Sequence, residues 1–144
     1  FGVFVREALS RCGAAGDTLT FEISERDARH HLADARRLVA GLREAGCRTT
    51  LCGFGRDAVS FGLLRSLPVD YLKIDGDIVL GIGRGSHVDF IKMKAVARVA
   101  QATHRRTIAE FVEDEETTRK LRESGVDYVQ GFGVAKPRPL SDLD

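Results

Sequence analysis

The sequence predicts an α/β fold in which parallel strands alternate with helices. Short segments whose apolar residues recur at every second position are separated by segments whose apolar residues recur at every third and fourth position. Strands separated by helices of this length imply parallel pairing through right-handed crossovers. A sheet of this kind either stays open or closes into a barrel. We identify no internal repeat, low-complexity tract or linker along the chain.

The first half of the chain contains the clearest helical signal. From Leu32 to Ala45, apolar residues recur at three and four positions, and Gly46 is a natural C-terminal stop. This spacing predicts an amphipathic helix. The other elements expected here are a helix over residues 4–12, a turn over 13–17, and strands over 19–24 and 47–52.

The second half continues the alternation. Asp114 is expected to cap a helix, with Glu115 and Glu116 at its positive end and Gly125 after its last turn. The glycines of residues 80–87 do not directly follow a strand and open a helix, so we expect a loop there and not a phosphate cradle. The remaining expected elements are a helix over residues 57–66, a helix through 91–100, and strands over 69–75, 106–112 and 128–132.

Composition is that of an ordinary globular domain. The 144 residues are 43% hydrophobic and 30% charged, so one soluble domain with a buried core is expected. The net charge of +1 gives no electrostatic reason to expect a nucleic-acid polymer or an anionic membrane as partner. No apolar run approaches the roughly 18 residues of a membrane span. Because the chain starts with Phe1, we expect it to be part of a longer protein.

The cysteines indicate a reducing environment. Cys12, Cys47 and Cys52 form no CxxC pair and leave an odd count. This pattern argues against a disulfide framework and against a thiolate zinc site. A reducing cytosol is therefore the compartment that fits best.

Acidic residues gather where the predicted strands end. In a parallel barrel the carboxyl ends of the strands share one face, so these groups could converge around a ligand. Carboxylates arranged in this way make a hard-cation site for phosphate chemistry. Lys73 lies inside a predicted strand, where a neighbouring carboxylate is its obvious partner. The acidic pairs are Glu22 and Glu25, Asp75 and Asp77, and Glu110 and Glu113.

These residues also have structural interpretations. Glu25 could cap the helix that follows it, and Asp75 and Asp77 could be turn formers. Glu113 could belong to the acidic start of the last helix. Glu22 and Glu110 fit such interpretations less well, because each lies in an otherwise apolar strand where an unpaired carboxylate is costly.

Five stretches of the chain are specific in combination: LTFEISE, GCRTTLCGFG, LRSLPVDYLKID, RTIAEFVE and DYVQGFGVAKPRP. In this order and spacing they resemble the EAL domain, the family of cyclic di-GMP phosphodiesterases and their inactive relatives. The resemblance covers nearly the whole chain. It implies a modified TIM barrel with its active site at the carboxyl ends of the strands. Residues 1–144 would be the C-terminal portion of one such domain, a partial barrel from about the fifth strand onward.

The resemblance assigns roles around the metals of the family. Glu22 matches a metal-ligand glutamate, and Glu110 matches the glutamate near the metals and the attacking water. Lys73 matches the active-site lysine, and Asp75 matches its strand-end aspartate.

Further roles concern the ligand and a loop. Glu113 matches the glutamate that faces a guanine base, and Gln130 matches the glutamine of the final strand. Glu25 matches the glutamate that steadies the loop after the next strand. Phe111 departs from the family, because it replaces the usual glycine and places a ring where the backbone passes the site.

The stretch LCGFG departs from the family at the metal site. Active members have two adjacent aspartates before the Phe-Gly pair, which help to hold two Mg²⁺ or Mn²⁺ ions. Cys52 and Gly53 stand at these positions. A thiol is a poor substitute for an oxygen ligand of Mg²⁺, and glycine has no side chain. The Glu-Ala-Leu signature does not appear in the chain either, so we expect no cofactor as it stands, and Mg²⁺ or Mn²⁺ only if it is active.

Two hypotheses about function follow. The first is a degenerate, catalytically inactive EAL domain that acts as a regulatory or protein-interaction module in cyclic di-GMP signalling. The matched site residues would then be vestigial, a partial ligand site, or a buried polar network that keeps Lys73 neutralised; they are Glu22, Lys73, Glu110, Glu113 and Gln130. The second is an active metal-dependent phosphodiesterase specific for cyclic di-GMP and completed by another segment or subunit.

The expected partners follow from these hypotheses. They are cyclic di-GMP, other proteins or domains of the parent chain, and a second copy. A homodimer is expected because half a barrel leaves an unpaired strand edge. The expected location is the bacterial cytoplasm, including the cytosolic part of a larger or membrane-anchored signalling protein.

Overall fold

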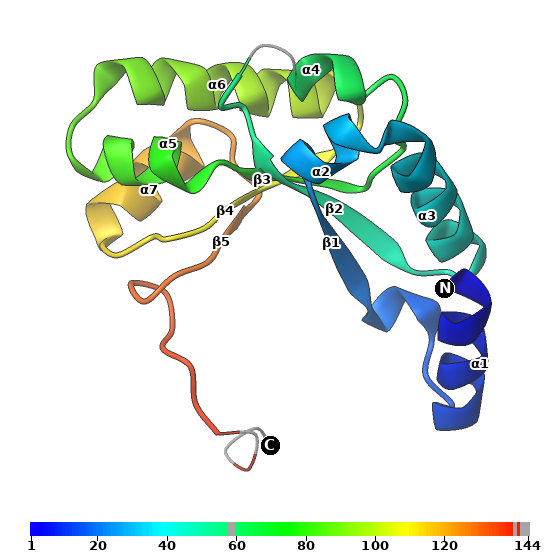
Figure 1. Cartoon of the computed structure of the whole chain (residues 1–144). Helices are drawn as coiled ribbons and strands as arrows, with labels where there is room; N and C mark the ends of the chain where they lie inside the picture. Colours follow the sequence, from blue (N-terminus) through cyan, green and yellow to red (C-terminus); the bar gives the residue numbers. More distant parts are fainter. Residues whose placement is uncertain (58–59, 140, 142–144) are drawn as a thin grey trace. The chain divides into compact units, whose positions relative to one another are not determined.

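The computed structural model describes residues 1–57, 60–139 and 141, and Figure 1 shows the course of the chain. Within this described part, no helix has the length and apolarity needed to cross a membrane. The strands are β1 (Thr20–Ser24), β2 (Arg48–Phe54), β3 (Tyr71–Ile74), β4 (Arg106–Ala109) and β5 (Tyr128–Val129). The α-helices are α1 (Gly2–Cys12), α2 (Glu25–His30), α3 (Leu32–Glu44), α4 (Ser60–Leu63), α5 (Gly76–Gly83), α6 (His87–Ala102) and α7 (Glu115–Glu123), and a 3₁₀ turn spans Gly16–Thr18.

The chain divides into two compact units, Phe1–Lys73 and Ile74–Asp144. The strands are ordered β1-β2-β3-β4-β5, as in the sequence, and the boundary between the units falls inside β3. The first unit thus contains β1, β2 and most of β3, and the second contains β4 and β5. Strands and helices alternate as predicted, so the α/β class is confirmed.

A parallel pair of strands forms the centre of the first unit. β1 runs alongside β2, with Glu22 opposite Thr50 and Ser24 opposite Cys52. Because the strands are parallel and in register, their carboxyl ends lie side by side. Residues at these two strand ends are therefore close together in space.

A hydrophobic core joins α1 to α3 in this unit. Val5 and Leu9 of α1 pack with Leu42 of α3 and with Cys47, which precedes β2. The helix predicted from the apolar spacing is confirmed as α3, and it ends where predicted. Gly46 follows it with a φ of 80°, a left-handed conformation that glycine adopts without a steric cost.

Three helices build the core of the second unit. α5 packs against both α6 and α7. Asp75, Ser86 and Asp114 cap α5, α6 and α7, because each side chain accepts a hydrogen bond from a backbone N–H of the first turn. The cap predicted at Asp114 is confirmed. The side chains that these helices bury are Ile78, Val79 and Ile82 of α5, Met93, Val96, Ala97 and Ala100 of α6, and Thr117 and Leu121 of α7.

One hydrogen-bond arrangement, between an aspartate and a threonine, occurs at the start of a strand in each unit. Asp70 Oδ2 accepts hydrogen bonds from the N–H of Thr49 at 2.8 Å and from its hydroxyl at 3.4 Å. In the second unit, Asp127 Oδ2 accepts from the N–H of Thr107 at 2.7 Å and from its hydroxyl at 3.0 Å. The arginine before each threonine donates to the tyrosine after each aspartate. Two RT…VDY sequences thus form one repeated local structure, although no repeat was recognised in the sequence.

An extra residue interrupts the pairing where β4 ends. The N–H of Gln130 donates to the Ala109 carbonyl at 2.8 Å, and the Gln130 carbonyl accepts from the N–H of Val112 at 3.1 Å. In regular parallel pairing, the second bond would come from Phe111, so one residue is inserted. Glu110 and Phe111 together lie opposite Gln130, and Phe111 has a φ of 58°. We call residues 110–111 the β4 bulge.

Several predicted element boundaries are wrong. Residues 80–83 belong to α5 and not to a loop, because the apolar residues before and among the glycines recur at helical spacing. α2 was not predicted as a separate helix. The helix expected over residues 57–66 is limited to α4 among the described residues, with 58–59 outside them. The strands expected to reach 75, 112 and 132 end at Ile74, Ala109 and Val129, since caps and the β4 bulge replace ladder pairing there.

Candidate active site

The first unit brings Glu22, Cys52 and Lys73 together from three strands. Lys73 Nζ donates a hydrogen bond to Glu22 Oε1 and forms an ion pair with it. Cys52 Sγ donates to Glu22 Oε2 at 3.4 Å. Both oxygens of the predicted metal ligand therefore accept hydrogen bonds from side chains of other strands. We call these three residues the Glu22 cluster.

Burial differs sharply between the two charged members of the cluster. The Lys73 side chain is 6% exposed, whereas that of Glu22 is 53% exposed. The prediction that a neighbouring carboxylate pairs with Lys73 is confirmed, and Lys73 is the charge that most requires a partner. The hydrogen bond from Lys73 lowers the pKa of Glu22 below its ordinary value of 4.5, although partial burial opposes this. Glu22 is consequently ionised at neutral pH.

The positions beside Glu22 offer poor ligands for a divalent ion. The Cys52 thiol is soft and already donates to Glu22. Gly53 has no side chain, and its φ of 76° is a conformation that L side chains disfavour. Among residues 1–57, 60–139 and 141, no group of three His, Cys, Asp or Glu side chains is placed to hold a metal ion. The side chains of the Glu22 cluster do not fit such an ion, because an ammonium and a thiol lie on the two Glu22 oxygens.

Asp75 lies at the start of the second unit, directly after β3. It is 7% exposed, and its Oδ1 accepts a hydrogen bond from the N–H of Asp77 at 3.1 Å. This is the geometry of a helix N-cap. The turn predicted for Asp75 and Asp77 is therefore wrong: Asp75 caps α5, which begins at Gly76, and Asp77 lies in the first turn of that helix.

The β4 bulge places Glu110 and Phe111 beside Gly76. A Cβ built at Gly76 would lie 2.6 Å from two ring carbons of Phe111 and 3.7 Å from Glu110 Oε1. Phe111 is nevertheless 54% exposed. The side chains of Glu113 and Gln130 are also exposed, and the Gln130 backbone pairs with both ends of the bulge. The residues predicted for ligand binding thus gather around one irregular strand end.

Glu25 does not cap a helix. Ser24 Oγ accepts the hydrogen bond from the N–H of Asp27 at 3.4 Å, so Ser24 caps α2 and the capping interpretation of Glu25 is wrong. Glu25 is 7% exposed, and its Oε1 has no hydrogen-bond partner among the described residues. Its role in steadying the next loop stays a prediction, since residues 58–59 of that loop lie outside the described residues.

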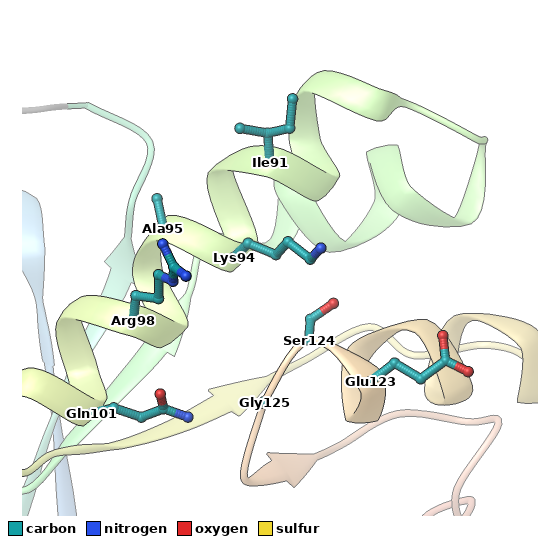
Figure 2. A pocket seen from close by; sticks show the side chains of 8 residues that line it. All are labelled: Ile91, Lys94, Ala95, Arg98, Gln101, Glu123, Ser124 and Gly125. Carbon is teal, nitrogen blue, oxygen red and sulfur yellow. The ribbon is translucent and has the colours of Figure 1, made fainter.

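A hollow of about 640 Å³ lies elsewhere in the second unit, between α6 and the end of α7. Figure 2 shows Lys94 and Arg98 projecting from α6, with Ser124 across the opening. Its one carboxylate, Glu123, pairs with Arg119 at 3.0 Å. None of the predicted site residues lines this hollow, so it is not the candidate active site.

The contact between Phe111 and Gly76 was missed at the level of sequence. Two features of the sequence bear on it: a glycine directly after a strand-end aspartate, and a bulky residue where the resemblance to the EAL domain implies glycine. Neither feature reveals the contact alone, because the residues are far apart in the chain and the β4 bulge brings them together.

Comparison with known proteins identifies the family. The EAL domain model matches residues 1–137. The cyclic di-GMP phosphodiesterase PdeB of Shewanella oneidensis is 36% identical over 121 residues, which are 84% of this chain and 14% of that protein. The cyclic di-GMP phosphodiesterase PdeF of Escherichia coli is 31% identical over 142 residues, which are 99% of this chain and 19% of that protein. The chain thus spans less than a fifth of the length of these two relatives.

Solved structures of EAL domains also match the chain. The FimX EAL domain of Xanthomonas citri in complex with cyclic di-GMP matches with a TM-score of 0.91 and 31% identity, over 97% of this chain and 55% of that one. The EAL domain of Mycobacterium smegmatis DcpA matches with a TM-score of 0.86 and 30% identity, over 96% of this chain and 62% of that one. The predicted correspondence to part of the EAL barrel is confirmed. The chain belongs to the EAL domain family.

Proposed function

We propose that this chain is the C-terminal portion of a non-catalytic EAL domain that regulates through binding, with cyclic di-GMP as ligand and other proteins as partners. The observation that supports this most directly is the Glu22 cluster, in which Lys73 and Cys52 donate to the two carboxylate oxygens. A divalent ion would have to displace an ammonium and would gain a thiol and a bare glycine as neighbours.

Loss of the metals removes the chemistry but leaves groups that can bind. Metal activation of water and charge stabilisation contribute several kcal/mol to phosphodiester hydrolysis, so losing them lowers the rate on the order of 10³-fold or more. Lys73 is buried and paired with Glu22, so the groups open to a ligand lie at and beside the β4 bulge. The amide of Gln130 and the carboxylates of Glu110 and Glu113 can accept hydrogen bonds from a guanine base. These are the vestigial catalytic and ligand-binding residues of the proposed module.

Binding of cyclic di-GMP by relatives supports this ligand. The Xanthomonas citri FimX EAL domain, 31% identical to this chain, is described in complex with cyclic di-GMP. The Pseudomonas aeruginosa FimX EAL domain, 27% identical, is described as bound to it as well.

Calorimetry with and without metal tests the proposal. Titration of the chain with cyclic di-GMP in EDTA should give saturable heat, and incubation with Mg²⁺ or Mn²⁺ should give no linear dinucleotide. Absence of heat at high micromolar ligand would leave only the protein-interaction form of the proposal. Metal-dependent turnover that is lost in Glu110→Gln would contradict inactivity.

An active phosphodiesterase completed by another segment is the second candidate. It is favoured by the retention of Glu22, Lys73 and Glu110, and by relatives described as cyclic di-GMP phosphodiesterases. Adding the upstream part of the parent protein distinguishes the candidates, because only this second function predicts that turnover then appears with Cys52 and Gly53 unchanged.

The proposed module forms a homodimer. Exposed apolar side chains on and near α1, among them Phe1 at 68% and Phe4 at 62% exposed, favour a homodimer of this chain. A monomeric mass by light scattering at high concentration would rule this out.

The proposed location is the bacterial cytoplasm. The three cysteines are free, which fits this compartment.

A further inference from the structure

We propose that Phe111 is a stacking surface for a guanine base of cyclic di-GMP, a role that rests on the proposed function. The ring projects from the β4 bulge, is 54% exposed and lies against the first residue of α5. The group that it recognises is the aromatic face of a purine attached to a phosphodiester.

The backbone of Phe111 is held in a conformation that favours glycine. Its φ of 58° lies in the left-handed region, where a Cβ crowds the following carbonyl oxygen and a bulky residue is rare. Hydrogen bonds from Gln130 to Ala109 and from Val112 to Gln130 enforce this conformation on both sides. Strained residues of this kind concentrate at ligand-binding sites, and bulges beside such sites aim side chains outward. The backbone conformation favours glycine at this position, so it does not explain why the chain has a phenylalanine. A function of the aromatic ring does explain it.

Gly76 makes room for the ring. A Cβ at this position would lie 2.6 Å from both Cδ2 and Cε2 of Phe111, so any larger residue would push the ring away. The contact fixes one edge of the ring and leaves more than half of the residue exposed. A ring placed in advance loses little conformational freedom when a flat ligand stacks on it.

Acidic residues near Phe111 in the chain suit guanine in particular. Glu110 Oε1 is 3.7 Å from the same Cβ position at Gly76, and Glu113 follows two residues after Phe111 with an exposed side chain. Stacking is tolerant of base identity, whereas carboxylates accept from the N1–H and the exocyclic amine of guanine. The ring thus supplies affinity, and the carboxylates supply selectivity.

Binding of cyclic di-GMP and of GMP to the whole chain, in EDTA, tests this role. Phe111→Leu keeps apolar bulk but removes the π-face, and we expect it to raise the Kd for cyclic di-GMP by about 5- to 150-fold, as for loss of one stacked base. Phe111→Tyr should bind like the unmodified chain. Gly76→Ala should weaken binding because it displaces the ring, and Phe4→Leu, which changes an exposed ring of the other unit, should have no effect. With labelled Phe111, guanine should shift the ring resonances, which a purely structural role would not produce.

The outcomes separate this inference from the function on which it rests. If cyclic di-GMP binds the unmodified chain and Phe111→Leu leaves its Kd within twofold, stacking is wrong and nucleotide binding stands. If neither cyclic di-GMP nor GMP binds at millimolar concentration, both are wrong, and a protein-contact role for the ring takes their place. Equal weakening by Phe111→Leu and Phe111→Tyr would also overturn stacking, because tyrosine keeps the ring.

Discussion

Replacing Glu22 by glutamine should destabilise the fold in a manner that depends on pH. Glu22→Gln keeps the shape of the side chain but removes the charge that pairs with Lys73. The Lys73 side chain is 6% exposed, so little water can solvate its ammonium once the carboxylate charge is gone. The substitution therefore tests whether the Glu22 cluster stabilises the structure without a metal.

The magnitude follows from the unequal burial of the pair. A hydrogen bond to a charged group contributes about 1.5–3 kcal/mol, and an exposed ion pair about 0–1 kcal/mol. Glu22 is 53% exposed, so solvent screening places the loss between these ranges, at about 1–2 kcal/mol. For a chain of this size, this corresponds to a fall in Tm of about 2–8 °C. Lys73→Met, which removes the buried charge itself, should cost less, because apolar replacements of buried charges are often neutral.

The sign of the pH dependence is fixed by the lowered pKa of Glu22. A group whose pKa is lower in the folded state contributes stability above its unfolded pKa and loses it as the pH falls through the folded one. The difference in unfolding free energy between the unmodified chain and Glu22→Gln should therefore be full at pH 7 and should close below the ordinary value of 4.5. Urea denaturation at several pH values measures it, with Glu44→Gln, whose side chain is 73% exposed, as the control. Equal stability at pH 7, or a difference that grows as the pH falls, would refute the reasoning.

Further predictions concern the strand ends and the thiols. Gly131→Ala should destabilise the fold by more than about 2 kcal/mol in urea denaturation, because its Cβ would lie 2.3 Å from a backbone oxygen, whereas Gly62→Ala, with open space, should be tolerated. Asp127→Ala should lower the free energy of unfolding by about 1–3 kcal/mol, because the Thr107 N–H loses the carboxylate that accepts from it at 2.7 Å. Hydrogen exchange of the Thr107 amide should become faster, and unchanged exchange would contradict the role of this hydrogen bond. Exposed Cys12 should react with a thiol reagent at pH 8 well before Cys47, because burial raises the pKa of Cys47 and shields it; comparable rates would contradict this burial.

Elements defined by side-chain periodicity could be predicted from the sequence. α3 was predicted because its apolar residues recur on one face, and the cap of α7 because an aspartate precedes two glutamates. α5 was missed because Gly81 and Gly83 suggest a loop, although Asp75 caps the helix and Ile78 and Ile82 are buried at helical spacing. Glycine content misled the prediction where tertiary packing decides the structure.

The candidate site was predicted as a set of residues but not as a set of contacts. The family pattern selected Glu22, Lys73 and Glu110, yet it gave no indication that Glu22 would accept from both an ammonium and a thiol. The β4 bulge depends on hydrogen bonds between residues about 20 apart in the chain, which no local pattern reveals. Its consequence, the Phe111 ring against Gly76, could not be predicted for the same reason.

Titration of Mn²⁺ into the chain, followed by electron paramagnetic resonance, tests the central claim most directly. With Lys73 and Cys52 on the oxygens of Glu22, we expect the free-ion signal to be undiminished at millimolar protein. Introducing Cys52→Asp and Gly53→Asp together with Lys73→Met, which also frees the Glu22 oxygen held by the ammonium, should restore binding, at a backbone cost of about 1 kcal/mol for the left-handed position 53. Two bound ions per unmodified chain, lost on Glu22→Gln, would contradict the account.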